Sequence, residues 1–193
     1  MVGVRAGYGE PSYSVVETLD TGIEVRHYSA RTAAQTTVEA QGRSSNEGRA
    51  FSVLANYIFG GNKGRNAIAM TTPVEASSRP AQIAMTSPVE AASRSGSYQM
   101  RFFLPEGYDA KTAPIPNDAR VKLVELPETT MAVLRFSGSR GDDDVDRFKA
   151  QLLANLERGQ WKPEGEPVAF FYDPPWTLPP LRRNEVAVAV VQR

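Results

Sequence analysis

The order of helix-like and strand-like segments limits the possible folds of this chain more than any other feature. Apolar residues recur at helical spacing in two segments, 45–59 and 142–158, and shorter strand-like segments surround each of them. This order is not a regular βαβ alternation, so a doubly wound parallel sheet is not favoured. The sequence therefore predicts an α+β domain of two related halves. Their strands join into a curved, barrel-like sheet, and each half packs one helix on it.

The ends of the two predicted helices carry their own signals. Ser44 stands three residues before Glu47, the spacing of a capping box, and Gly60-Gly61 supplies a stop. These signals predict a first helix from Ser45 to Phe59. A second helix is predicted from Asp142 to Arg158, since acidic residues at its start favour the positive end of the helix dipole. The predicted apolar positions of the two helices are Phe51, Leu54, Tyr57 and Ile58, then Val145, Phe148, Leu152 and Leu156.

Strands are predicted where apolar and β-branched residues alternate or cluster between turn residues. Between the first helix and the next strand, the segment 69–79 recurs as 84–94, an offset of 15 residues (84 − 69), so that Met70 and Met85 hold equivalent positions. Two copies are too few for a solenoid, and a local duplication that forms an extended or hairpin-like excursion is the modest interpretation. The predicted strands are Tyr13–Thr18, Gly22–His27, Thr32–Ala40, Tyr98–Leu104, Val121–Leu126, Met131–Phe136, Val168–Tyr172 and Val186–Val191.

Composition excludes several kinds of chemistry. The chain of 193 residues has no cysteine and one histidine, His27, which rules out thiolate metal sites, covalent c-type haem and multi-histidine metal centres. Basic and acidic residues number 22 each, so no basic face points to nucleic acid. No segment is long and apolar enough to span a membrane. We expect one soluble domain over residues 1–193 with a core from about 13 to 191, and residues 1–12 as a leader remnant or flexible start.

The residues that could bind a ligand each have a structural interpretation as well. His27 is either a half-buried residue at a strand end or an axial ligand of haem iron, since it shares strand parity with Ile23 and Val25. Met70 and Met85 fit either thioether ligands or fillers of apolar surface. Arg182-Arg183 is either a solvated pair or a partner for carboxylates. Neither a nucleophile elbow nor a phosphate-binding loop is found, so no catalytic residue is predicted.

Short motifs spread along nearly the whole chain resemble the SOUL haem-binding family. They include IEVRHY at 23–28, YIFGGN at 57–62, IAMTTPV at 68–74, YDPPW at 172–176 and RRNEV at 182–186. Further matches lie at 13–16, 36–39, 116–121 and 136–138, in family order. The duplicated M-T-x-P-V segment resembles bacterial members. The resemblance implies a distorted antiparallel β-barrel of two related halves, similar to the effector-binding domains of some transcription regulators.

The same resemblance implies reversible, non-covalent binding of haem or another porphyrin in an apolar cleft beside the first helix. It makes His27 a candidate iron ligand, while Phe51, Leu54 and Ile58 become a candidate cleft wall that is equally suited to core packing. The candidate partners for the porphyrin propionates are Lys63, Arg65, Arg182 and Arg183, with Met70 and Met85 near the cleft.

Two other functions stay open at the level of sequence. One is an enzyme that acts on a tetrapyrrole, by metal removal or haem breakdown, and the other is a protein-interaction module without a ligand. A carrier, buffer or sensor of haem is preferred over both because the resemblance is to a binding family. The sequence does not decide between a cytoplasmic protein and one exported to the periplasm after removal of a leader.

Overall fold

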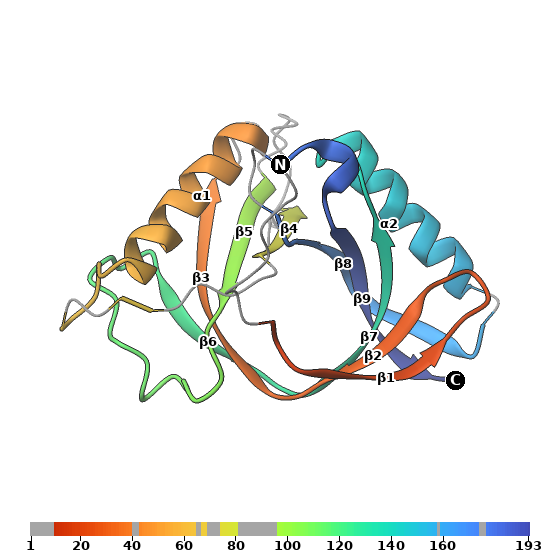
Figure 1. The fold of residues 1–193 in the computed structure, drawn as a ribbon, viewed down its shortest axis with the longest axis horizontal. Helices are drawn as coiled ribbons and strands as arrows, with labels where there is room; N and C mark the ends of the chain where they lie inside the picture. Colours follow the sequence, from red (N-terminus) through yellow and green to blue (C-terminus); the bar gives the residue numbers. More distant parts are fainter. Residues whose placement is uncertain are drawn as a thin grey trace, which may run out of the picture.

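The computed structural model describes residues 10–39, 43–64, 67–68, 74–80, 96–157, 159–173 and 177–193. Within them the chain forms nine strands, two α-helices and one short 3-10 helix (Figure 1). In chain order these are β1 (Tyr13–Thr18), β2 (Glu24–Tyr28), β3 (Arg31–Glu39), α1 (Arg43–Ile58), β4 (Val74–Pro80), β5 (Gly96–Phe103), β6 (Lys122–Leu126), β7 (Thr129–Phe136), α2 (Asp142–Leu156), β8 (Trp161–Phe171), η1 (Pro179–Leu181) and β9 (Asn184–Gln192).

Most predicted elements are confirmed within two residues at each end. Helix α1 ends where the glycine pair predicts: Gly60 has a φ of 110°, and the Gly61 N–H donates to the carbonyl of Asn56 at 2.8 Å. Two strands are exceptions. Strand β4 lies in the duplicated segment, for which no regular strand is predicted, and strand β8 begins at Trp161 instead of the predicted Val168. Pro163 and Gly165 are unfavourable in strands, so the sequence pattern does not predict the first half of β8. The register of β8 with β9 shifts between Glu164 and Val168.

The sheet curls at a bend where one antiparallel strand pair ends and the next begins. Strand β2 pairs with β7, and strand β3 pairs with β6, all antiparallel. The short links Ser29-Ala30 and Pro127-Glu128 therefore lie at the same bend, and β6 and β7 are successive stretches rather than a hairpin. Proline cannot donate to a ladder, which favours the break at Pro127. Figure 1 shows the resulting half-barrel, with two arms rising from the bend.

The two helices cover the outer sides of the two arms (Figure 1). Helix α1 packs on β3 and β5, and helix α2 packs on β7, β8 and β9. A large apolar core fills the space beneath them and includes Leu54, Ile58, Leu152 and Leu156. Within the described part of the chain, neither helix is long and apolar enough to cross a bilayer.

The concave side of the sheet, called the inner face below, has a second and smaller apolar cluster. Its buried members are Tyr28, Ala33, Phe103, Met131, Val133, Phe170, Tyr172 and Ala187. The strand order across the described residues is β1-β2-β7-β9-β8-β4-β5-β3-β6. The predicted fold class is thus confirmed: a curled antiparallel sheet of barrel type with one helix on each half.

Candidate functional site

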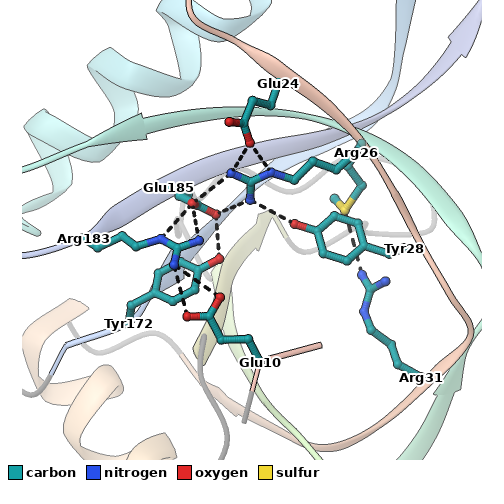
Figure 2. A network of polar contacts seen from close by, with 9 residues as sticks. Glu10, Glu24, Arg26, Tyr28, Arg31, Tyr172, Arg183 and Glu185 are labelled. Carbon is teal, nitrogen blue, oxygen red and sulfur yellow. Dashed lines mark hydrogen bonds and ion pairs between the residues drawn. The ribbon is translucent and has the colours of Figure 1, made fainter. Parts of the chain in front are cut away.

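A buried ion pair joins two strands at the centre of the inner face. Arg26 of β2 donates to Glu185 of β9 from Nη1 to Oε2 at 2.9 Å and from Nη2 to Oε1 at 3.2 Å. The side chains are 4% and 0% exposed. Glu24, two residues earlier on the same side of β2, accepts a second bond from Arg26 Nε at 2.7 Å. Figure 2 shows these side chains pointing toward one another inside the curl of the sheet.

Glu185 is shared with a second arginine and a tyrosine (Figure 2). Tyr172 donates its hydroxyl to Oε2 at 2.6 Å, and Arg183 donates from Nη2 to Oε1 at 3.0 Å. The Arg183 guanidinium lies over the Tyr172 ring, 3.8 Å from its centroid. Its Nη1 also reaches both carboxylate oxygens of Glu10, at 3.1 and 3.2 Å, so the segment before β1 is tied to the same network.

The protonation states follow from this arrangement. Burial by itself would raise the pKa of Glu185, but the hydrogen bonds and charge of Arg26 outweigh it and hold that pKa below its usual range. Burial and the neighbouring Glu185 charge raise the pKa of Tyr172 well above 10.0. Glu185 is therefore an ionised acceptor, and Tyr172 keeps the proton that it donates.

Arg31 lies on the same face in a different situation. Its guanidinium sits over the rings of Tyr28 and Phe103, at 4.5 and 5.2 Å from their centroids. Among the described residues, its buried Nε and Nη1 have no hydrogen-bond partner, and its Nη2 meets only the sulfur of Met131 at 3.9 Å. Burial lowers the pKa of Arg31, since the charge of Glu75 compensates it only in part.

A cavity of about 570 Å³ borders Arg31 at the bend of the sheet. Its walls are the link 29–30 with the first residues of β3, the loop 104–109 and the end of β6. Pro11 and Ser12 complete the lining, and Ser12 donates a hydrogen bond to Glu106 across it. Polar and apolar groups thus meet in a hollow next to a buried cation, as in many small-molecule sites.

His27 lies on the opposite side of β2 from Arg26 and Tyr28, as strand alternation requires. Its Nδ1 is 3.2 Å from the hydroxyl of Thr130, and its Nε2 is 3.8 Å from the Glu128 carboxylate. The side chain is 42% exposed. The structure therefore does not bring His27 together with the inner-face arginines, although it stands beside the bend. Ligation of iron by His27 stays a prediction.

The residues predicted to form a cleft beside the first helix occupy two different environments. Leu54 and Ile58 are buried in the outer core, whereas Phe51 is 38% exposed and packs edge-on against Phe102, with centroids 5.4 Å apart. A groove of about 620 Å³ does run along α1, but other residues form it. They are Gly48, Arg49, Ser52, Val53 and Asn56 from the helix, with Asp118 and Arg120 from the facing loop.

The candidate propionate partners are spread over the molecule. Lys63 is exposed near the end of α1, Arg182 donates from Nε to the carbonyl of Thr177 at 2.7 Å, and Arg183 belongs to the Glu185 network. Among these three described candidates, only Arg183 is on the inner face. Arg65, Met70 and Met85 lie outside the described residues.

Sequence reasoning did not identify Arg26, Arg31, Tyr172 or Glu185 as site residues. A signal was present, because Glu24 and Arg26 alternate with the apolar Ile23 and Val25 along a predicted strand. A charged residue on a buried strand needs a partner or a ligand. What the sequence did not show is that both faces of β2 are covered.

Solved structures with this fold share little sequence with the chain. The C-terminal domain of EcmrR has a TM-score of 0.64 at 10% identity and covers 94% of this chain and 99% of its own. An uncharacterized conserved protein from Listeria innocua has a TM-score of 0.61 at 10% identity, with 96% and 94% covered. A hydrolase from the same organism has a TM-score of 0.55 at 9% identity, with 96% and 94% covered. At such identities the likeness concerns the fold alone.

Sequence comparison assigns the family. The search of curated proteins found no match to this chain. The profile of the SOUL heme-binding proteins matches residues 8–189, which spans every strand and helix described above except the last few residues of β9. Since this match covers nearly the whole chain, the protein belongs to the SOUL family of haem-binding proteins.

Proposed function

We propose that this protein binds haem or a related tetrapyrrole non-covalently and reversibly, as a carrier, buffer or sensor. The observation that carries the proposal is the family match over residues 8–189. The inner face supports it, since aromatic rings and guanidinium groups lie side by side there and a cavity of about 570 Å³ borders one of these guanidinium groups, Arg31. A planar, apolar ring system with acidic side groups needs both kinds of contact.

The residues of this chain suit the two parts of such a ligand. Apolar porphyrin surface leaves water when it meets apolar residues of the cavity lining such as Tyr108 and Leu126, and each Å² of apolar surface removed from water contributes about 25 cal/mol. The propionates need cations, and Nε and Nη1 of Arg31 have no partner among the described residues, so either of them could donate to a carboxylate oxygen. The chain's part in binding is thus to exclude water from the ring and to neutralise its acids.

Bound iron would add an axial coordination position, and His27 is the one imidazole in the chain that could fill it. The two faces of β2 separate two versions of the proposal. In one, His27 ligates iron from the outer side of the bend. In the other, the porphyrin lies against the inner face and is held through its ring and carboxylates without His27. The contacts of Arg31 favour the second version.

Titration of the purified protein with haem, followed by absorption spectroscopy, tests the proposal. We expect a saturable Soret shift with a dissociation constant on the order of 1 μM or lower, which corresponds to about −8 kcal/mol. An unshifted Soret band at roughly tens of micromolar protein contradicts the proposal. Mass analysis of the recovered haem shows whether it is returned intact, as binding requires, or converted.

The groove along α1 needs its own control, because the family resemblance implied a cleft there. The double variant Arg49→Ala, Arg120→Ala removes the two cations of that groove. Both residues are away from the inner face, so haem affinity is expected to stay within about two-fold of the unchanged protein. A loss of ten-fold or more, an energy of about 1.4 kcal/mol, would move the site to α1.

A further inference from the structure

Arg31 differs from every other arginine that the structure describes on the inner face. Arg26 and Arg183 pair with Glu185. Arg101 pairs with Glu75 and donates from Nε to Gln35 Oε1 at 2.8 Å. Arg31 has no ion pair in the described part of the chain, although the residue is half-buried, its Nε and Nη1 are fully buried and its guanidinium lies over two rings. A buried charge without a partner is costly, and such groups are normally paired or bind something.

The surroundings of Arg31 favour a ligand with a ring and an acid. Tyr28 and Phe103 lie against its guanidinium, and Tyr108 and Leu126 line the cavity beside it, so an aromatic or other planar apolar group could pack there. Arg31 also belongs to the lining of the 570 Å³ cavity, which gives the ligand a place next to the cation. Three carboxylates in the same lining would repel an anion elsewhere in the cavity. They are Glu106, Asp109 and Glu125. The acid group of a ligand is therefore favoured only at the Arg31 end of the cavity.

We propose that Arg31 receives the acidic group of a planar, apolar ligand, with one of its two unpartnered nitrogens, Nε or Nη1, as the donor to a carboxylate or a sulfonate. The inference rests on the proposed function in one respect: the proposed function is what makes the ligand a tetrapyrrole. The site itself follows from the unpaired donors, the flanking rings and the adjoining cavity. It differs from the Arg182-Arg183 pair that the sequence suggested, because Arg183 already has two carboxylate partners.

Two matched pairs of probes test the acid group directly. The first pair is haem and its dimethyl ester, which differ in the charge of the propionates. The second pair is 1-anilinonaphthalene-8-sulfonate and N-phenyl-1-naphthylamine, which differ in the sulfonate. Affinities are measured for the unchanged protein, for Arg31→Met and Arg31→Gln, and for the control Arg120→Met, whose arginine is exposed beside α1.

Arg31→Met is expected to weaken the two anionic probes roughly ten- to hundred-fold, the range of one charge-assisted hydrogen-bonded pair. The two uncharged probes should change little, and Arg120→Met should change none of the four. Urea unfolding of ligand-free protein provides the structural check: removal of a buried unpaired charge should leave the midpoint unchanged or raise it. Arg31→Gln, which keeps polarity without charge, should follow Arg31→Met in all four affinities.

Equal affinity of the Arg31 variants and the unchanged protein for both anionic probes would overturn the inference. So would an equal loss for charged and uncharged probes, because that result would assign Arg31 a packing role. If the unchanged protein binds neither form of haem, the proposed function fails. The sulfonate pair then still decides the role of Arg31, since its readout is dye fluorescence and does not involve a tetrapyrrole.

Discussion

Arg26 and Glu185 are 159 positions apart in the sequence and form a two-pronged ion pair across the inner face, at 2.9 and 3.2 Å. Each residue belongs to one of the motifs that the chain shares with the family, IEVRHY and RRNEV. The pair connects β2 to β9 across β7, and Arg183 and Tyr172 complete the shell around the carboxylate. The two motifs therefore meet in one buried polar cluster.

Glu185→Gln is expected to destabilise the fold strongly. The substitution keeps the shape of the side chain but leaves Arg26 and Arg183 facing a neutral amide in a buried place. Loss of one partner of a buried ion pair costs about 3–5 kcal/mol in the free energy of unfolding, and urea denaturation of the variant would measure this loss. Asp118→Asn, in the exposed pair with Arg120, is the control and should change stability little. Equal effects of the two substitutions would remove the central role of Glu185.

Stability should fall on acidification through the same carboxylate. The pKa of Glu185 lies below its ordinary value of 4.5 in the folded protein, so the unfolded chain takes up its proton first. This contribution is fully present above pH 4.5 and is lost as the pH falls through the lower, folded-state pKa. Free energies of unfolding measured between about pH 3 and pH 7 should show a slope that is reduced in Glu185→Gln. Identical slopes in both proteins would assign the acid sensitivity to other carboxylates.

His27→Ala separates iron ligation from binding at the inner face. Because His27 lies on the side of β2 away from Arg31, we expect the variant to keep haem affinity within a few-fold and to keep the Soret maximum of the unchanged protein. Loss of an imidazole-bound spectrum in a variant with normal far-ultraviolet circular dichroism would instead identify His27 as the iron ligand. Thr130→Val, which removes the 3.2 Å contact to Nδ1, should then shift the spectrum in the same direction.

Glu10→Gln tests whether Arg183 also receives an acid group. The Glu10 carboxylate holds Arg183 Nη1 at 3.1 and 3.2 Å and would compete with a ligand carboxylate for it. If the second propionate of haem takes this place, the variant should bind haem more tightly by up to roughly five-fold, the strength of a partly exposed pair. Binding of the dimethyl ester should not change. Unaltered affinity for haem would exclude Arg183 and leave Arg31 as the inner-face cation for the ligand.

Local patterning was sufficient for the elements and for the fold class. Helical spacing and a glycine stop placed α1, and alternation placed most strands, because these signals depend on neighbours in the chain. The same reasoning shortened β8 at Pro163 and Gly165, where pairing with β9 outweighs weak local preference. Pattern reasoning also grouped Phe51, Leu54 and Ile58 as one cleft wall. Helical periodicity shows which residues share a face of a helix, but it does not show which parts of the protein cover that face.

The sequence by itself determined the family, the number of halves and the kinds of chemistry open to a chain with one histidine and no cysteine. Only the tertiary structure decided which charged residues meet. Strand alternation put Arg26 and Val25 on different faces of β2. The pairing of β2 with β7 and of β7 with β9 then brought Arg26 to Glu185. The bend at 29–30 left Arg31 between two rings without a carboxylate among the described residues. Contacts across a curled sheet depend on strand order and curvature, and neither property is encoded in any short stretch of sequence.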